Sequence, residues 1–273
     1  MLKKILAVVL GLVLCLGMTM MVGCGDPSFS GNYVEADSNT ITTFSESVQQ
    51  AEDEGASQSV DFNAGVKAKV YVETEDVKLT SDYTMALVGD TFKLEGNLDV
   101  QLKMIYGGYN VKTITKGKFW YADNYMFMDA NATSVIGSVS ETVAVKGKMP
   151  MAIEDVLAEY GGGEDLEVSP LVEYLQYVES EHVKFYIDDG EENKKIKIVF
   201  DDLVEAGEKI DGTVIIVYDT EYNVIATSVD LTSTLTYGGE TQTIVTRVSI
   251  VPYDGEINVP ADAMTWNTIS TGY

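Results

Sequence analysis

The chain has 273 residues, with 43 acidic and 18 basic side chains and a formal net charge of -25 at pH 7. Arg247 is its single arginine and no basic patch is evident in the sequence, which excludes an electrostatic nucleic-acid binder. A chain this acidic is expected to be soluble and to repel anionic lipid headgroups. The apolar share of 45% is enough for the core of one domain.

The N-terminus has the pattern of a secretory signal peptide. Lys3 and Lys4 precede an uncharged, mostly apolar run that extends from Ile5 to Gly25. Within it, Met21-Val22-Gly23-Cys24 resembles the lipobox of bacterial lipoproteins. In that family the cysteine thiol receives a diacylglycerol, the chain is cut before it, and the new N-terminus is acylated with a fatty acid such as palmitate. The resemblance implies a signal peptide over residues 1–23 and a lipid anchor at Cys24 that holds the protein on the extracytoplasmic face of a cell membrane.

Two alternatives remain open for this stretch. Ile5 to Val22 could stay as a transmembrane anchor, because about 18 apolar residues just span a bilayer. Gly11 and Gly17 favour cleavage instead. Secretion without an anchor would leave Cys24 as a free thiol; the other cysteine, Cys15, lies in the signal, so no disulfide is expected.

Residues 24–59 are rich in Ser, Thr, Asn, Gly, Asp and Glu, a composition typical of a flexible tether. Ile41, Phe44 and Val48 within it have helical spacing. We therefore predict a helix in this segment that packs against the domain that follows, which spans residues 60–273.

Period-two alternation dominates that domain. The longest run, from Phe92 to Tyr106, places apolar residues on one face and charged or amide residues on the other, as in a half-buried strand. Sliding the chain by 131 residues superposes Tyr106-Gly107-Gly108 on Tyr237-Gly238-Gly239. Because the apolar positions on either side keep the same phase, we interpret the two halves as duplicated β-meanders.

Helical patterns separate the two meanders. Ile153, Val156, Leu157 and Tyr160 follow Pro150 at i, i+3, i+4 and i+7, and Ser169-Pro170 opens a second pattern. A short helical turn is predicted over residues 201–206. The predicted fold class is α+β: a large curved antiparallel sheet, a half-open barrel of two meanders, with two or three helices packed on its concave side.

This plan behind a lipidated cysteine resembles the LolA/LppX-like group of bacterial lipoprotein carriers and envelope lipoproteins. Two stretches resemble local segments of that group, the hairpin at residues 118–127 and the closing segment Ile257-Asn258-Val259-Pro260-Ala261-Asp262-Ala263. The resemblance implies a half-open barrel whose apolar interior accepts acyl chains. It carries over no catalytic or ligand-binding residue.

Little in the sequence points to catalysis or to a metal. His182 is the single histidine, and no nucleophile elbow, zinc-binding helix or phosphate loop is present. The acidic turn from Asp188 to Asn193 lacks the spacing of a calcium loop. Trp120 and Tyr125 could stack on a sugar, but a role in packing is favoured. We expect no enzymatic activity, no cofactor and no metal site.

The leading hypothesis is a monomeric, membrane-anchored carrier of a hydrophobic small molecule or lipid, held between sheet and helices. The alternative is a surface-displayed interaction or sensory module with a fully packed core. In the carrier hypothesis the ligand contacts one face of the long strand and the first helix, through the following residues: Leu94, Leu98, Val100, Leu102, Met104 and Leu157.

Overall fold

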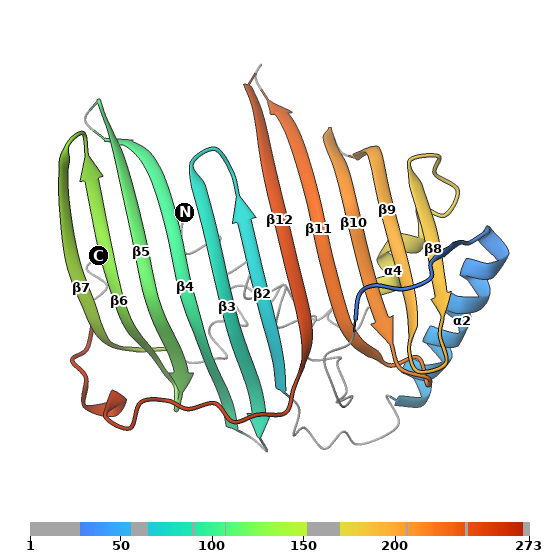
Figure 1. Cartoon of the computed structure of the whole chain (residues 1–273), viewed down its shortest axis with the longest axis horizontal. Helices are drawn as coiled ribbons and strands as arrows, with labels where there is room; N and C mark the ends of the chain where they lie inside the picture. The colour runs from blue at the N-terminus through green and yellow to red at the C-terminus, as the bar shows by residue number, and fades with distance from the viewer. Residues whose placement is uncertain are drawn as a thin grey trace.

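The computed structural model describes residues 28–55, 65–88, 91–106, 108–151, 170–205, 207–237 and 240–269. The lipobox with Cys24 and the predicted helix that contains Leu157 lie outside these ranges. The described chain forms one antiparallel sheet, drawn in Figure 1, with helices at one end of it. Its elements, in chain order, are β1 (Val34–Glu35), α2 (Ser38–Gly55), β2 (Gly65–Glu73), β3 (Val77–Val88), β4 (Thr91–Tyr106), β5 (Tyr109–Ala122), β6 (Tyr125–Ile136), β7 (Val139–Pro150), α4 (Pro170–Leu175), β8 (Val183–Asp189), β9 (Lys194–Glu205), β10 (Glu208–Tyr218), β11 (Val224–Tyr237), β12 (Glu240–Tyr253) and η1 (Ala263–Thr265).

The sheet consists of two meanders joined edge to edge. Among the described residues its order is β1-β8-β9-β10-β11-β12-β2-β3-β4-β5-β6-β7, so β12 of the second meander pairs with β2 of the first. Strand β4 is 16 residues long, in agreement with the predicted run, and the hairpin from Tyr106 to Tyr109 corresponds to the one from Tyr237 to Glu240. Asp123 and Asn124 join β5 to β6 with positive φ angles of 50° and 61°, as a two-residue type I′ turn requires.

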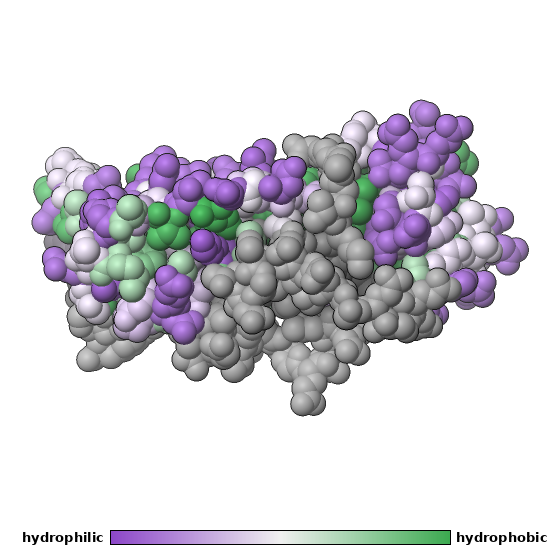
Figure 2. Space-filling model, turned by 90° about the horizontal axis from the view of Figure 1, so that it is seen from below, coloured by the Kyte–Doolittle hydropathy of each residue, from purple (hydrophilic) through white to green (hydrophobic). Residues whose placement is uncertain are grey.

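Cross-strand register divides the sheet into two chemically distinct faces. Directly paired residues point to the same side, so Leu94 and its β5 partner Tyr121 lie on one face, together with Val100 and its β3 partner Leu79. Helices α2 and α4 lie on that side, which we call the helix face (Figure 1). Figure 2, seen from below, shows hydrophilic residues along the upper margin of the left half of the molecule and hydrophobic residues beneath them.

The main core lies on the helix face and includes one side of α2. Phe44 of α2 is 6% exposed and its ring meets those of Tyr218 and Tyr222 edge-on, at centroid distances of 5.5 and 5.4 Å. Ile41 and Val48 are buried on the same helix stripe. The helix predicted inside the tether is therefore confirmed, and it packs against the sheet as expected.

The predicted α+β class with two or three helices is wrong. Among the described residues α2 is the one long helix, and α4 has only six residues before the chain continues in turns, with Val178 N–H donating to the Leu175 carbonyl in an i to i+3 bond. The sheet is also open rather than a half-barrel, with β1 at one edge and β7 at the other. Apolar spacing indicated amphipathic segments but not their length, and strand pairing accounts for most of the described chain.

The helical turn predicted at residues 201–206 is also wrong, because β9 continues as a strand to Glu205. A β-bulge explains the misleading pattern: Asp202 has a φ of 57°, and the pairing with β10 shifts register between Ile210 and Gly212. The extra residue places Phe200 and Leu203 on the same face although they are three apart. That spacing imitates one turn of helix.

Both edges of the sheet are partly covered. The two-residue strand β1 pairs with β8, and the C-terminal segment runs beside β7, with a parallel bridge between Lys148 and Thr268. Gly147 admits this segment, because a Cβ there would lie 2.5 Å from Ile269 Cγ1. Trp266 of the same segment meets Trp120 edge-on at 6.0 Å. Covered edges reduce the tendency of long strands to pair with other molecules.

Phe44→Ala tests whether α2 is part of the folded core. Removing the ring leaves a cavity against Tyr218 and Tyr222, so the free energy of unfolding should fall by about 3–5 kcal/mol. Denaturant titration followed by circular dichroism measures the change. The exposed neighbour Gln49→Ala serves as the control; equal midpoints for the two variants would show that α2 contributes little to the core.

Candidate functional site

The residues predicted to contact a hydrophobic ligand occupy two environments. Leu94 and Val100 are 1% and 2% exposed and belong to the core that also contains Phe44. Leu98 and Leu102 are half-buried against the same core. Met104, at the far end of β4, is 46% exposed. Leu157 lies outside the described residues.

Apolar surface continues along the helix face beyond this core. Val139 and Val143 on β7 are 69% and 53% exposed, and register places both on the same side as Met104. Further apolar residues of that face on β5 and β6 are half-buried or exposed: Tyr109, Val111, Met126, Met128 and Ile136. Exposed apolar groups on a folded surface mark binding sites for apolar ligands or partners. Here they are interrupted by one polar cross-strand row, Thr113-Ser134-Glu141, which lies between the rows of Val139 and Val143. We call this area, from Met104 to Val143, the apolar end of the helix face.

The aromatic hairpin does not offer a stacking platform. Trp120 is 9% exposed and Phe127 is 1% exposed, and the C-terminal segment covers both through Trp266 and Ala263. Lys146 Nζ caps the Trp266 ring at 4.5 Å from its centroid. The packing role favoured from sequence for Trp120 is confirmed.

Several acidic groups of the described residues are paired with lysines. Asp188 and Asp189, in the turn considered for calcium, form ion pairs with Lys195 and Lys194. Asp201, Asp202 and Asp211 bring carboxylate oxygens within 4.8 Å of one another, the spacing of a metal site. Lys209 binds two of them, however, and lowers the pKa of Asp202 by hydrogen bonding. Lys209 thus offsets one of the three negative charges, and the Asp202 N–H donates to Asp211 Oδ1.

Among the described residues, the contacts of the His182 imidazole are with a backbone carbonyl and a carboxylate. Its Nδ1 lies 2.9 Å from the Asp201 carbonyl oxygen and its Nε2 3.9 Å from a carboxylate oxygen of Glu181. Its side chain is 47% exposed, and neither contact is with a serine or cysteine nucleophile.

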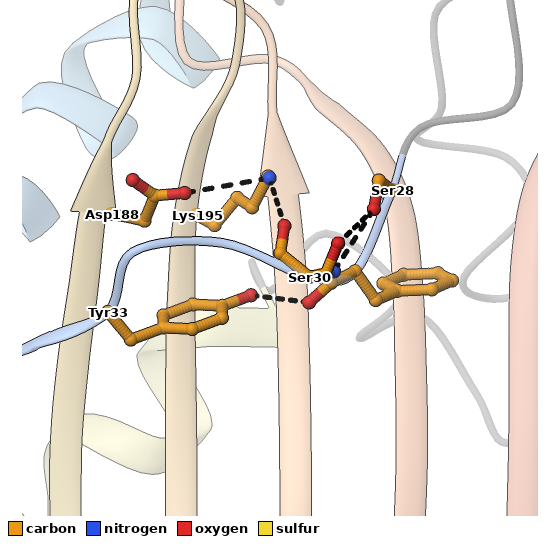
Figure 3. Close-up of polar contacts among 6 residues, drawn as sticks. Ser28, Ser30, Tyr33, Asp188 and Lys195 are labelled. Atoms are coloured by element: carbon orange, nitrogen blue, oxygen red, sulfur yellow. Dashed lines mark hydrogen bonds and ion pairs between the residues drawn. The ribbon is translucent and has the colours of Figure 1, made fainter.

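A site that the sequence analysis missed lies on the opposite face, where the N-terminal segment crosses the sheet. Residues 28–37, which we call the strap, run across β10 and β9 to β8 and end in the edge strand β1 (Figures 1 and 3). Phe29 packs on Val217, Ile225 and Ala226 of β10 and β11. The chain then rounds the sheet edge as β1 and begins α2 on the helix face.

A mostly buried lysine fastens the strap. Lys195 Nζ donates to the Ser30 carbonyl oxygen at 2.6 Å and lies 3.5 Å from Asp188 Oδ2; the two side chains are 11% and 16% exposed (Figure 3). Gly31 permits the close approach, since a Cβ there would lie 2.2 Å from that carboxylate oxygen. A mostly buried ion pair is screened much less by salt than a surface ion pair.

Tyr33 fixes the other end of the strap. Its hydroxyl donates to the Phe29 carbonyl oxygen at 2.8 Å, and Lys197 Nζ lies over its ring. Burial of the phenol, and then the negative charge of Asp188, raise the pKa of Tyr33 to about 12. No sequence signal links these residues, because Ser30 and Lys195 are 165 positions apart.

Among the described residues, no helix has the length and hydropathy needed to traverse a bilayer. No protein-family model matches the chain, and none of the curated proteins matches it. Among solved structures, a porin-like protein from Bacteroides uniformis is similar at 8% identity, with a TM-score of 0.20, over 72% of this chain and 98% of that one. At this TM-score the likeness supports no conclusion about this protein.

Lys195→Met tests the fastening of the strap. It leaves Asp188 without its cation in a mostly buried site, so we expect the free energy of unfolding to fall by about 3 kcal/mol. Hydrogen exchange of the amides of residues 29–36 should accelerate. The double variant Lys195→Met with Asp188→Asn should regain stability without slowing that exchange, because the bond to Ser30 is still lost. Unchanged exchange in Lys195→Met would refute the fastening role.

Proposed function

We propose that this protein is a membrane-anchored extracytoplasmic lipoprotein, not an enzyme, that binds a hydrophobic ligand such as a lipid acyl chain on its helix face. The observation that supports ligand binding is the apolar end of the helix face. There Met104, Val139 and Val143 are exposed although each has the phase of a core position. The Met21-Val22-Gly23-Cys24 sequence supports the anchor.

The ligand site that we propose is displaced from the position expected from sequence. Leu94 and Val100 already pack against the chain's own side chains and have little surface left to offer. Leu98 and Leu102 are half-buried beside that core. Met104 lies beyond it and is exposed, as are Val139 and Val143 on the same face. An acyl chain would therefore lie along the far half of β4 and across β5 to β7. Burial of apolar surface would drive its binding at about 25 cal/mol per Å² before ordering costs.

Extraction tests the ligand directly. The full chain, purified from membranes of a bacterial host in mild detergent, is treated with organic solvent and the extract is analysed by mass spectrometry. Solvent removes non-covalent lipid but leaves a thioether-linked anchor, which intact mass then reports at Cys24. An extract without lipid, together with a protein captured by the same sample, would favour the alternative of an interaction module.

Two adjacent residues of β4 provide a matched pair of variants. Met104 lies on the helix face, whereas Ile105 is 77% exposed on the opposite face of the same strand. Met104→Glu should weaken binding of a fluorescent fatty acid about tenfold, because it removes one apolar contact of about 1.5 kcal/mol and adds a charge. Ile105→Glu adds the same charge and should leave the titration unchanged. Equal effects from both variants would contradict a site on the helix face.

A further inference from the structure

Basic residues are confined almost entirely to the sheet face opposite the helices. Of the 18 basic residues, all but Lys3 and Lys4 are described, and register places every one of these except Lys194 on that face. We call it the lysine face. Its basic residues are Lys67, Lys69, Lys78, Lys93, Lys103, Lys112, Lys116, Lys118, Lys146, Lys148, Lys184, Lys195, Lys197, Lys209 and Arg247.

Carboxylates on the same face are fewer. Register gives ten at strand positions, against 15 basic residues, and Asp202 at the β9 bulge makes eleven. The ten are Glu35, Glu73, Asp82, Glu95, Asp99, Asp129, Asp188, Asp201, Asp211 and Asp230. At its strand positions and the bulge the face thus has an excess of four positive charges, on a chain whose net charge is -25.

Several of these lysines are available to an external anion. Lys67, Lys69 and Lys118 are exposed, and none has a carboxylate oxygen within 4.0 Å among the described residues. Lys69 and Lys118 belong to one cross-strand row, Lys69-Asp82-Asn97-Lys118, on four consecutive strands. Lys93 and Lys112 are half-buried and also lack an ion pair within the described ranges. Available cations spread over several strands match an extended anionic surface better than one small anion.

The strap places the anchoring end of the chain on the same face. Ser28 lies four positions after Cys24, and Phe29 is packed on the lysine face of β10 and β11. Four residues reach at most about 14 Å, so a lipid at Cys24 would hold this face close to the headgroups. We propose that the lysine face docks on the anionic headgroups of the membrane that carries the anchor. This inference rests on the proposed function, because it uses the anchor at Cys24.

Net charge alone predicts the opposite, a repulsion between protein and membrane. Acidic groups on the helix-face side are farther from the membrane by one packed layer, which is about 10 Å. The Debye length is about 8 Å at physiological ionic strength, so salt screens their repulsion of the headgroups. The headgroups therefore interact mainly with the lysine face, where each basic residue near an anionic surface strengthens binding about fivefold. Docking leaves the helix face, with its apolar end, directed away from the bilayer.

Lysine acetylation tests the docked orientation. The full chain, purified from a bacterial membrane, is placed in nanodiscs of phosphatidylcholine alone or with about one third phosphatidylglycerol. A water-soluble acetylating reagent should label Lys67, Lys69, Lys112 and Lys118 about fivefold more slowly in the anionic discs. Lys194 should react alike in both, and about 0.5 M NaCl should abolish the difference. Intact mass of the same sample reports the lipid at Cys24.

A charge-matched pair of variants distinguishes the effect of the lysine face on docking from the effect of net charge. Lys69→Gln with Lys118→Gln removes two available cations and should shift the docking equilibrium about 25-fold, read at Lys67 and Lys112. Asn39→Asp with Gln49→Glu changes net charge equally on exposed positions of α2 and should leave the labelling unchanged. Equal labelling in the two kinds of disc, with lipid present at Cys24, would overturn docking and leave the anchor standing. Protection in phosphatidylcholine discs as well would overturn its electrostatic basis.

Discussion

Unbroken hydrogen-bonded register across the sheet is the constraint on which every other feature depends. Because side chains alternate along each strand and paired residues share a side, one shift by a single residue would exchange the apolar and charged faces of a strand. From β8 to β7 the pairing keeps Phe185, Val70 and Leu94 on one side and Lys197, Lys69 and Lys118 on the other. Even the β9 bulge preserves this division, because Phe200 and Leu203 both remain on the helix face.

The two faces are completed by different parts of the chain. On the helix face α2 contributes Ile41, Phe44 and Val48 to the main core. On the lysine face the N-terminal strap packs Phe29 over β10 and β11, while Trp266 near the C-terminus packs on Trp120. A sheet of this size cannot bury both faces with its own residues. The terminal segments cover what remains and at the same time occupy the two edges.

The proposed functions follow from this division of the sheet. An apolar ligand suits the end of the helix face that α2 and α4 do not cover, where Val139 and Val143 are exposed. An anionic membrane suits the face that carries the lysines and receives the strap. The ion pair between Lys195 and Asp188 connects the two proposals, because it fixes where the chain leaves the sheet on its way to Cys24. The anchor would then lie in the bilayer, the lysine face would lie against its headgroups, and the helix face would lie farthest from it.

Strand positions and their two-sided chemistry follow from the sequence alone, because period-two alternation is local and strong: the limits of β4 and the burial of Phe44 were predictable from spacing. The helix content was not predictable from the sequence. Amphipathic spacing indicates which face of a segment is apolar but not how long a helix is, and a bulge can imitate a helical turn. Leu94 and Met104 look alike in the sequence, yet Leu94 is buried in the main core and Met104, farther along β4, is exposed beyond it. The pairing of Lys195 with Ser30, and the gathering of dispersed lysines on one face, depend on contacts between residues far apart in the chain. Only the tertiary structure could bring them together.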